Sequence, residues 1–569
     1  MFKLNLLDPL GDWNPQLLRE LKGRLKPRNL ILAGGISLLG QLLLFVTFLG
    51  RLPKGTLDQP TKFPQSDPYC TGFITYGNDR KCLVDAAGEL VINWQKWSLD
   101  WFLVLSIIGI FGLIVAGTYL LIDNLAYEER KGTLNFIRQS PRSPQNILLG
   151  KILGVPVLLY IVALLALPLH LGMGLASHIP LIRILGFYGV LGTSCLFFYS
   201  LSLLFGLVSS SGLNGLEAWL GSGTVFLFIL VGIHNPIANN TLDWLNVFSP
   251  GLVLQYLIAA TGIEGTISYS YLEVQKLFWF GVPVGGGILG LSSLLVINYS
   301  LWTYGIWQAM QRRFPSPGKT IFSKLQSYLL VAGFEIVALG FAGSRSRYHQ
   351  TENFAFLLAY NFVLFLGLII TLTPQRQALV DWARYRKQKP SNRKGLLNLS
   401  LLRDLAIGEK SPAIIAIALN AAITFTILIS WIVVSPYDDK KLSVLMALVL
   451  SLSLIVIGAI IAQLVVFMQT RQQGLWIVGV LGAVTVLPPL TLSLLSVDIV
   501  TEPNLWLFTV FAFEAVKNAG LSGVFLALLG QLSLLVLGAL QVTRQLKKVG
   551  VSDSVGLFAS QPKIKPSSD

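Results

Sequence analysis

Side chains that could form a catalytic or metal-binding site are few and scattered in this chain. Its histidines have no metal-ligand spacing, and no His-Glu-x-x-His motif or acidic metal cluster accompanies them. The nearest approach to a phosphate-binding loop is Gly318-Lys319-Thr320, but Arg313 stands where that motif needs its first glycine. We therefore expect no metal, no cofactor, no ATPase motif and no enzymatic activity. The histidines are His170, His178, His234 and His349.

One acidic residue, Glu335, falls inside an apolar run that could cross a membrane. A charge at the bilayer centre costs at least about 2.5–3.5 kcal/mol on insertion scales. An acidic residue at such a position is therefore expected to have either polar partners or a function in transport. We favour a structural group with polar partners, because proton-coupled transporters present several ionisable residues in their spans. A place on a proton path is the alternative.

Three cysteines complete the reactive side chains. Cys70 and Cys82 lie together in the loop after the first apolar run, where an oxidising exterior would permit a disulfide. Two free thiols are the equal alternative. Cys195 lies within an apolar run and is expected to be an inert core residue.

The composition is that of a membrane protein. Apolar residues make up 53% of the 569 residues, charged residues only 12%, and the mean hydropathy is +0.65. A span takes about 20 residues, and we predict an all-α polytopic membrane protein with about 12 transmembrane helices. The predicted spans are 30–50, 100–122, 152–172, 183–208, 216–233, 277–300, 327–343, 354–373, 412–434, 442–468, 475–496 and 520–541.

Lysine and arginine set the expected orientation. Most of them fall in segments on one side of the predicted topology, and cytosolic loops carry such an excess. We predict a multi-pass protein of the plasma (cytoplasmic or inner) membrane with both termini in the cytosol. The same rule explains the net charge of +15 without nucleic acid as a partner.

The predicted spans form two pseudo-repeated six-helix halves. In each half a charged cytosolic segment follows the second span, at 123–151 and at 374–411. Each segment ends in a basic residue followed by Ser-Pro, a serine N-cap with proline at the first helical position. The halves differ in the external loop 51–98, which is long only in the first, and in the basic tract 384–395 of the second.

The first charged segment, YEERKGTLNFIRQSPRSPQNILLGK (127–151), is the most distinctive part of the chain. Gly132 should interrupt the helix of the second span, and Thr133 can cap a new one. Several apolar residues should give the segment a side that presses into a partner, while its charged residues set the register. The apolar residues are Leu134, Phe136, Ile137, Ile147 and Leu148.

Two further elements are expected to lie at the membrane surfaces. Residues 14–28 place Leu17, Leu18, Leu21 and Leu25 on one helical face, as in an amphipathic helix in the headgroup layer. The external segments 234–276 and 497–519 contain apolar stretches too short to cross, which suit re-entrant or interfacial helices. A basic flank and an ordinary surface loop are the respective alternatives.

The order of these elements resembles the permeases of type-2 ATP-binding-cassette (ABC-2) exporters. The segment that begins Glu-x-x-x-Gly-Thr is similar to their cytosolic coupling segment, and 14–28 is similar to their elbow helix. The resemblance implies a membrane-spanning permease subunit that moves an unknown substrate outward by alternating access, driven by a separate ATPase subunit. It also implies that the coupling residues are Glu128, Glu129, Gly132, Thr133, Arg138, Arg142, Ser143 and Pro144, with Lys410, Ser411 and Pro412 in the second half.

The expected organisation follows from the same resemblance. A first permease half covers 1–301, a cytosolic linker 302–326, a second half 327–542 and a cytosolic tail 543–569. Two other functions stay open. A twelve-span secondary transporter also has two six-span halves. Its long cytosolic loop would lie between spans six and seven, whereas in this chain the long cytosolic segments follow spans two and eight. A polytopic membrane enzyme acting on lipid or glycan would need a catalytic constellation, which the sequence does not display.

Overall fold

The structure is a computed structural model that describes residues 8–53, 66–72, 74–76, 79–86, 89–209, 215–234, 237, 240–263, 269–342, 347–388, 399–434, 441–468 and 473–550. The chain divides into two compact units, Met1–Pro315 and Ser316–Asp569. Within the described residues, ten helices are long and apolar enough to cross a membrane. The protein is thus an all-α polytopic membrane protein, as predicted.

Unit 1 is built around α9 (Leu181–Ser209), which packs against α5 (Gly117–Arg130) and α14 (Ile288–Arg313). The helix α4 (Trp94–Phe111) continues through a π-helical turn, η2 (Gly112–Ala116), into α5, and together they form one span of 37 residues. Tyr199 of α9 supports this turn, because its hydroxyl donates to the Leu113 carbonyl at 2.7 Å.

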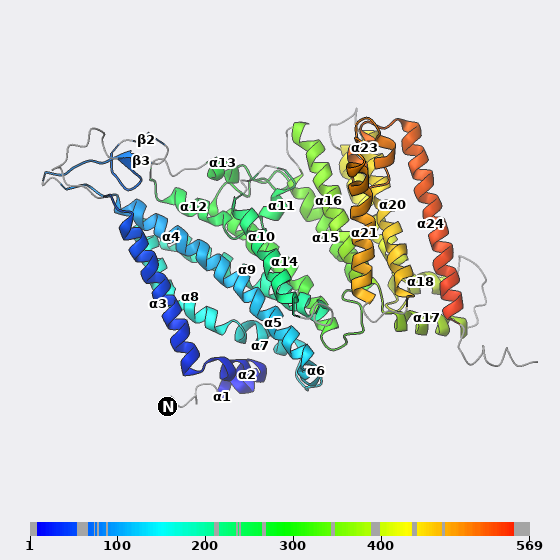
Figure 1. The fold of residues 1–569 in the computed structure, drawn as a ribbon, viewed down its shortest axis with the longest axis horizontal. Helices are drawn as coiled ribbons and strands as arrows, with labels where there is room; N and C mark the ends of the chain where they lie inside the picture. The colour runs from blue at the N-terminus through cyan, green and yellow to red at the C-terminus, as the bar shows by residue number, and fades with distance from the viewer. Residues whose placement is uncertain are drawn as a thin grey trace, which may run out of the picture. The chain divides into compact units, whose positions relative to one another are not determined.

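A second group of helices in unit 1 packs around α8 (Val157–Ala176), which contacts both α3 (Pro27–Gly50) and α4 (Figure 1). The other helices of unit 1 are α1 (Asp8–Trp13), α2 (Pro15–Arg24), α6 (Thr133–Arg138), α7 (Pro144–Gly154), α10 (Glu217–His234), α11 (Asp243–Asn246), α12 (Leu252–Ala260) and α13 (Tyr269–Gln275). The short helices α11 to α13 occupy the segment where the sequence predicted re-entrant or interfacial helices.

The loop between α3 and α4 carries a small antiparallel sheet in the order β1-β3-β2. Its strands are β1 (Ser66–Asp67), β2 (Ile74–Tyr76) and β3 (Asp79–Lys81). Cys70 and Cys82 form a disulfide across this loop, which decides between the two alternatives left open by the sequence. Tyr69 and Trp97 of the same region lie in an aromatic cluster with Phe48 and Trp101.

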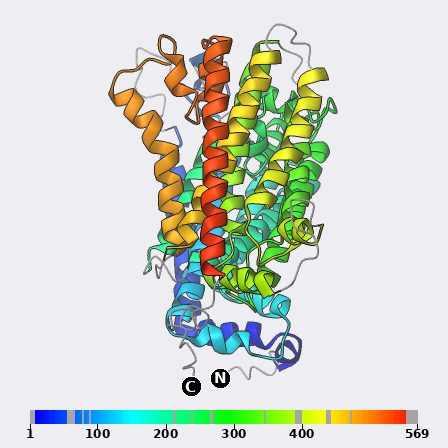
Figure 2. The ribbon, with the colours of Figure 1, turned by 90° about the vertical axis from the view of Figure 1, so that its right-hand side faces the viewer.

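Unit 2 is built around α20 (Lys441–Val466), which packs against α16 (Arg347–Leu372), α19 (Ile414–Val434), α21 (Gln473–Leu494) and α24 (Leu521–Val549). Figure 2 shows α24 upright, and α24 contacts α17 and α22. The remaining helices are α15 (Lys324–Phe341), α17 (Arg376–Gln388), α18 (Leu399–Ile407), α22 (Pro503–Trp506) and α23 (Ala512–Val516).

Several predicted boundaries differ from the structure. The predicted span 277–300 begins too early, since α14 starts at Ile288 after a turn-rich stretch and continues to Arg313. The predicted linker 302–326 is therefore helical at both ends, and only 314–323 lies between α14 and α15. The predicted tail from 543 begins inside α24, and 551–569 and most of the basic tract lie outside the described residues. The count of 12 spans stays a prediction.

Candidate functional site

Residues 127–151 form a compact structure at the end of α5, which we call the ledge. The helix α5 ends at Arg130, and Gly132 has a φ of +71°, a left-handed conformation that glycine adopts without strain. The short helix α6 follows, and α7 then leads toward α8 (Figure 1). The predicted helix break at Gly132 is confirmed.

The two predicted caps in the ledge have different outcomes. Ser143 is the N-cap of α7, as predicted, because its hydroxyl accepts from the Asn146 N–H at 3.3 Å and Pro144 occupies the first turn. The prediction that Thr133 caps α6 is wrong, since Gly132 occupies the N-cap position. The Thr133 hydroxyl instead donates to the Glu128 carbonyl at 3.2 Å and joins the start of α6 to the end of α5.

Most of the apolar side chains of the ledge face inward. Leu134, Ile137, Ile147 and Leu148 are buried in a core cluster with Leu207, Met310 and Phe314 from α9 and the end of α14. The prediction that these four residues press into a partner is therefore wrong: α9 and α14 already cover them. Phe136 is the exception, because 79% of its surface is exposed.

A buried ion network anchors the ledge at Lys151. This side chain is completely buried, and its ammonium donates to Glu128 Oε2 at 2.7 Å and to Asn124 Oδ1 at 2.8 Å. Glu20 of α2 lies 3.8 Å from the same ammonium, and Arg19 approaches the other oxygen of Glu128 at 3.5 Å. Glu128, which the resemblance assigned to contact with the ATPase, thus holds α5, α7 and α2 together.

A helix is present within the predicted range 14–28, as α2, but it packs on protein. Asn14 caps α2 by accepting from the Leu17 N–H at 2.9 Å, and its amide donates to the Asn146 carbonyl of α7 at 2.6 Å. Leu17 and Leu21 are buried, so the prediction of a leucine face in the headgroup layer is wrong for these two residues.

Two glycines of α7 permit this close packing of α2. A Cβ at Gly150 would lie 2.8 Å from the backbone nitrogen of Leu17, and a Cβ at Gly154 would lie 2.5 Å from Glu20 Cβ. Real Cβ atoms do not approach so closely, hence any larger residue at either position would force α2 away from α7.

A second set of charges links the ledge to α14 and α10. Arg138 pairs with Glu129 at 3.2 Å, and its guanidinium carbon lies 5.9 Å from the centre of the Phe314 ring. Burial, and after it the Arg138 charge, holds the pKa of Arg313 below its usual value, while Glu129 opposes that shift. Arg130 approaches Glu217 at 3.8 Å and so connects the end of α5 with the start of α10.

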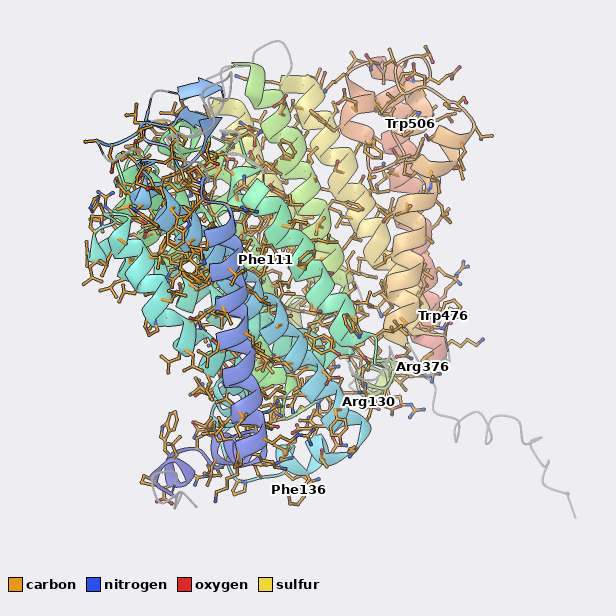
Figure 3. The ribbon with its side chains drawn as sticks, turned by 60° about the vertical axis from the view of Figure 1, so that its left-hand side comes forward. Phe111, Arg130, Phe136, Arg376, Trp476 and Trp506 are labelled. Carbon is orange, nitrogen blue, oxygen red and sulfur yellow. A yellow bond between two sulfur atoms is a disulfide. The ribbon has the colours of Figure 1, made fainter. Side chains whose placement is uncertain are left out.

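The outer surface of the ledge is aromatic and basic. Phe136 projects from α6 at the end of unit 1 (Figure 3). Arg130, Lys131 and Arg142 are exposed on the same segment, together with Gly132, Thr133 and Ser143. Of the predicted coupling residues in unit 1, the structure therefore places Arg142, Gly132, Thr133 and Ser143 at the surface, and it turns Glu128 and the Arg138 side chain inward.

The Ser-Pro pair of the second half serves a different purpose from that of the first. The prediction that Ser411 caps the next span is wrong, because α19 begins only at Ile414. Ser411 is buried and accepts from Lys324 Nζ at 2.7 Å, and the same ammonium donates to the carbonyls of Leu405 at 2.7 Å and Pro412 at 3.0 Å. Lys324 thus supplies a donor for the Leu405 carbonyl near the C-terminal end of α18, where the Tyr328 hydroxyl donates to the next carbonyl, that of Ala406, at 2.7 Å. Lys410 is exposed.

Replacing Lys324 is expected to loosen α18. Lys324→Met removes the ammonium that donates to three acceptors, and we expect a loss of about 1–3 kcal/mol in stability. Hydrogen exchange should become faster in 399–413. Lys410→Met, a matched change at an exposed lysine nearby, should leave both stability and exchange unchanged. Equal effects of the two variants would contradict this role of Lys324.

Glu335 of α15 lies fully buried beside polar groups from two other helices of unit 2. Thr424 Oγ1 of α19 donates to one carboxyl oxygen at 2.8 Å, and Asn361 Nδ2 of α16 donates to the other at 3.3 Å. Such partners are those expected of the structural role that the sequence favoured. Nearer the start of α19 and α15, the Asn420 amide donates to the Ser327 hydroxyl at 2.9 Å.

Among the described residues, no group of three or more His, Cys, Asp or Glu side chains is placed to hold a metal ion. Comparison with protein families, with curated proteins and with solved structures finds no match to this chain. The geometry of the ledge is therefore what supports a function.

Sequence reasoning missed Glu20 and Lys151 as members of this site. One signal was available: Glu20 stands three residues after Leu17, at the edge of the leucine face of its helix, where a buried carboxylate needs a partner. Lys151 carried no comparable signal, because the sequence does not say which lysine would face that carboxylate.

Proposed function

We propose that this chain is the membrane-spanning permease subunit of an ATP-driven exporter, and that a separate ATPase subunit docks on the ledge. The observation that carries this proposal is the outward Phe136 on a segment that is otherwise fixed to the bundle. Its exposed side chain amid basic residues suits a partner with an apolar pocket and an acidic rim.

The anchoring of the ledge suits the transmission of force. Glu128 is near the end of the continuous span that runs from Trp94 to Arg130, and Lys151 ties that end to α7 and α2. A push on α6 would therefore move three helices as one body. Displacement of α5 would reach the opposite side of the membrane through α4, and there it would drive the alternating access of a transported substrate.

The disulfide supports the orientation that this function requires. The Cys70–Cys82 bridge precedes α4, whereas the ledge follows α5, so the two lie at opposite ends of the 37-residue span. Disulfides persist outside the cytosol, and basic residues concentrate inside it. Both rules support a cytosolic ledge, and the permease that we propose would then lie in the plasma membrane with both termini in the cytosol.

Unit 2 offers a second candidate contact for the ATPase. The helices α17 and α18 follow its second span, and they are joined because Arg386 pairs with Asp404 at 2.7 Å. The surface of α18 includes Leu402 and Arg403, which repeats the combination of apolar and basic groups seen on the ledge. The single chain would then supply both halves of the permease.

The proposal is tested by purification of the full chain from its native membranes in a mild detergent. The expected result is that a subunit with a phosphate-binding loop co-purifies, identified by mass spectrometry, and that the complex hydrolyses ATP. ATP should then drive transport in sealed vesicles. Transport that depends on an ion gradient without ATP, or repeated purification without any nucleotide-binding subunit, would overturn the proposal.

A further inference from the structure

A cavity of about 500 Å³ lies within unit 1, between α4, α8 and α9. Its lining includes Gly109 and Leu113 of the α4–η2 span and Tyr199 of α9. On α8 it extends from Tyr160 to His170, which corresponds to about 15 Å along a helix that rises 1.5 Å per residue. The space is therefore long as well as large.

The polar groups on the cavity wall are already engaged with one another. Ser106 donates to the Phe102 carbonyl at 2.8 Å, so its oxygen accepts from His170 Nε2, also at 2.8 Å. His170 Nδ1 then accepts from the Tyr188 hydroxyl at 2.7 Å.

The other hydroxyls of the wall are engaged in the same way. The Tyr160 hydroxyl donates to the Ile152 carbonyl at 2.8 Å, and the Tyr199 hydroxyl donates to the Leu113 carbonyl at 2.7 Å. The hydroxyl donors of these side chains are thus already used in hydrogen bonds within the wall. The cavity therefore offers a mainly apolar surface.

The cavity opens on a surface formed by α8 and α9. Two of its lining residues, Leu164 of α8 and Leu196 of α9, are 65% and 39% exposed, so they stand at its mouth. Pro168 lies inside α8, where it removes the backbone hydrogen bond to Leu164 and favours a bend in the helix. Both helices lie among the candidate membrane spans.

We propose that this cavity binds one hydrocarbon chain of a membrane lipid, either acyl or isoprenoid. An elongated apolar space that opens to the bilayer interior is reached by lipid chains before any water-soluble ligand. A polar solute would find the hydroxyl and imidazole donors already used, and it would lose its own hydrogen bonds on entry. The bound chain packs against Leu113 and so supports the π-helical turn in the span that continues to Glu128.

Two glycines make the proposal testable without disturbing the fold. Gly192 and Gly109 line the cavity, and a Cβ at either position meets nothing within 4 Å. Gly192→Leu and Gly109→Leu should therefore fill the space with a side chain of their own. Gly189→Leu is the matched control, because Gly189 lies on the same helix with equal room and is not part of the cavity wall.

The full-length protein is reconstituted with a phosphatidylcholine that carries a photoreactive diazirine in one acyl chain, and in parallel with an isoprenoid alcohol that carries the same group. After illumination, we expect labelled peptides that contain the buried wall residues Tyr199 and His170. Label from the first probe identifies an acyl chain, and label from the second an isoprenoid chain. Gly192→Leu and Gly109→Leu should lose this label, whereas Gly189→Leu should keep it.

Label on the exposed residues of α3 serves as the reference for general bilayer contact and should be the same in all variants. The proposal is overturned if neither probe labels the buried wall, or if the cavity-filling variants are labelled as strongly as Gly189→Leu. The thermal midpoint of each variant shows that it is folded. Because no ATPase takes part, the outcome does not depend on the proposed function.

Discussion

Lys151→Ala is expected to destabilise unit 1 by about 3–5 kcal/mol, the cost of leaving a buried charge without its partner. The ammonium of Lys151 is completely buried between Glu128 and Glu20, and its loss would bring two carboxylates together with no cation between them. Arg19 could not replace it, because its guanidinium is 3.5 Å from Glu128 and about half exposed. Unfolding of the purified protein in detergent, followed by heat or denaturant, measures the loss.

The control for this result separates the charge from the volume of the side chain. Lys151→Met keeps most of the apolar stem but removes the charge, and it should destabilise the protein nearly as much as alanine does. Combining Lys151→Met with Glu128→Gln removes both charges of the closest pair and should recover part of the stability, since the two residues are in direct contact. Arg142→Ala, at an exposed position of the ledge, should have little effect. Additive effects in the double variant would contradict the buried pair.

Phe136→Asp is expected to abolish docking of the ATPase while leaving the permease folded. An exposed aromatic residue at the centre of an interface is the type of side chain that carries binding energy, and its truncation costs 2 kcal/mol or more at such positions. That corresponds to a Kd at least about 30-fold weaker. The introduced carboxylate would also face the acidic surface expected on the partner. Binding of the purified ATPase to the reconstituted permease measures the change.

Stability distinguishes a docking role from a folding role for Phe136. Since 79% of its surface is exposed, Phe136→Asp should leave the unfolding midpoint unchanged. Phe136→Leu keeps an apolar group and should retain most of the binding. Ile137→Asp, one residue further on, would bury a charge in the core and should unfold the ledge. Full ATPase binding by folded Phe136→Asp protein would show that the ledge docks no ATPase.

The fold class and many of the helix limits could be predicted from the sequence because they depend on local chemistry. Long apolar runs must form helices in a bilayer, where every backbone group needs an internal partner. Gly132 and the Ser143-Pro144 pair mark an end and a start through their own backbone preferences. The same reasoning failed at Ser411, because its hydroxyl accepts a hydrogen bond from Lys324, a buried residue distant in the sequence.

The sequence by itself determined that this is a polytopic helical membrane protein with a charged, broken segment after its second span. Only the tertiary structure decided which side chains of that segment face outward. α6 has six residues, too few for an apolar face to be read from periodicity, and its burial depends on α9 and α14, which are distant in the sequence. Glu128 turns inward because Lys151 is there to compensate its charge, and Phe136 stays outside because none of the described helices of unit 1 covers it.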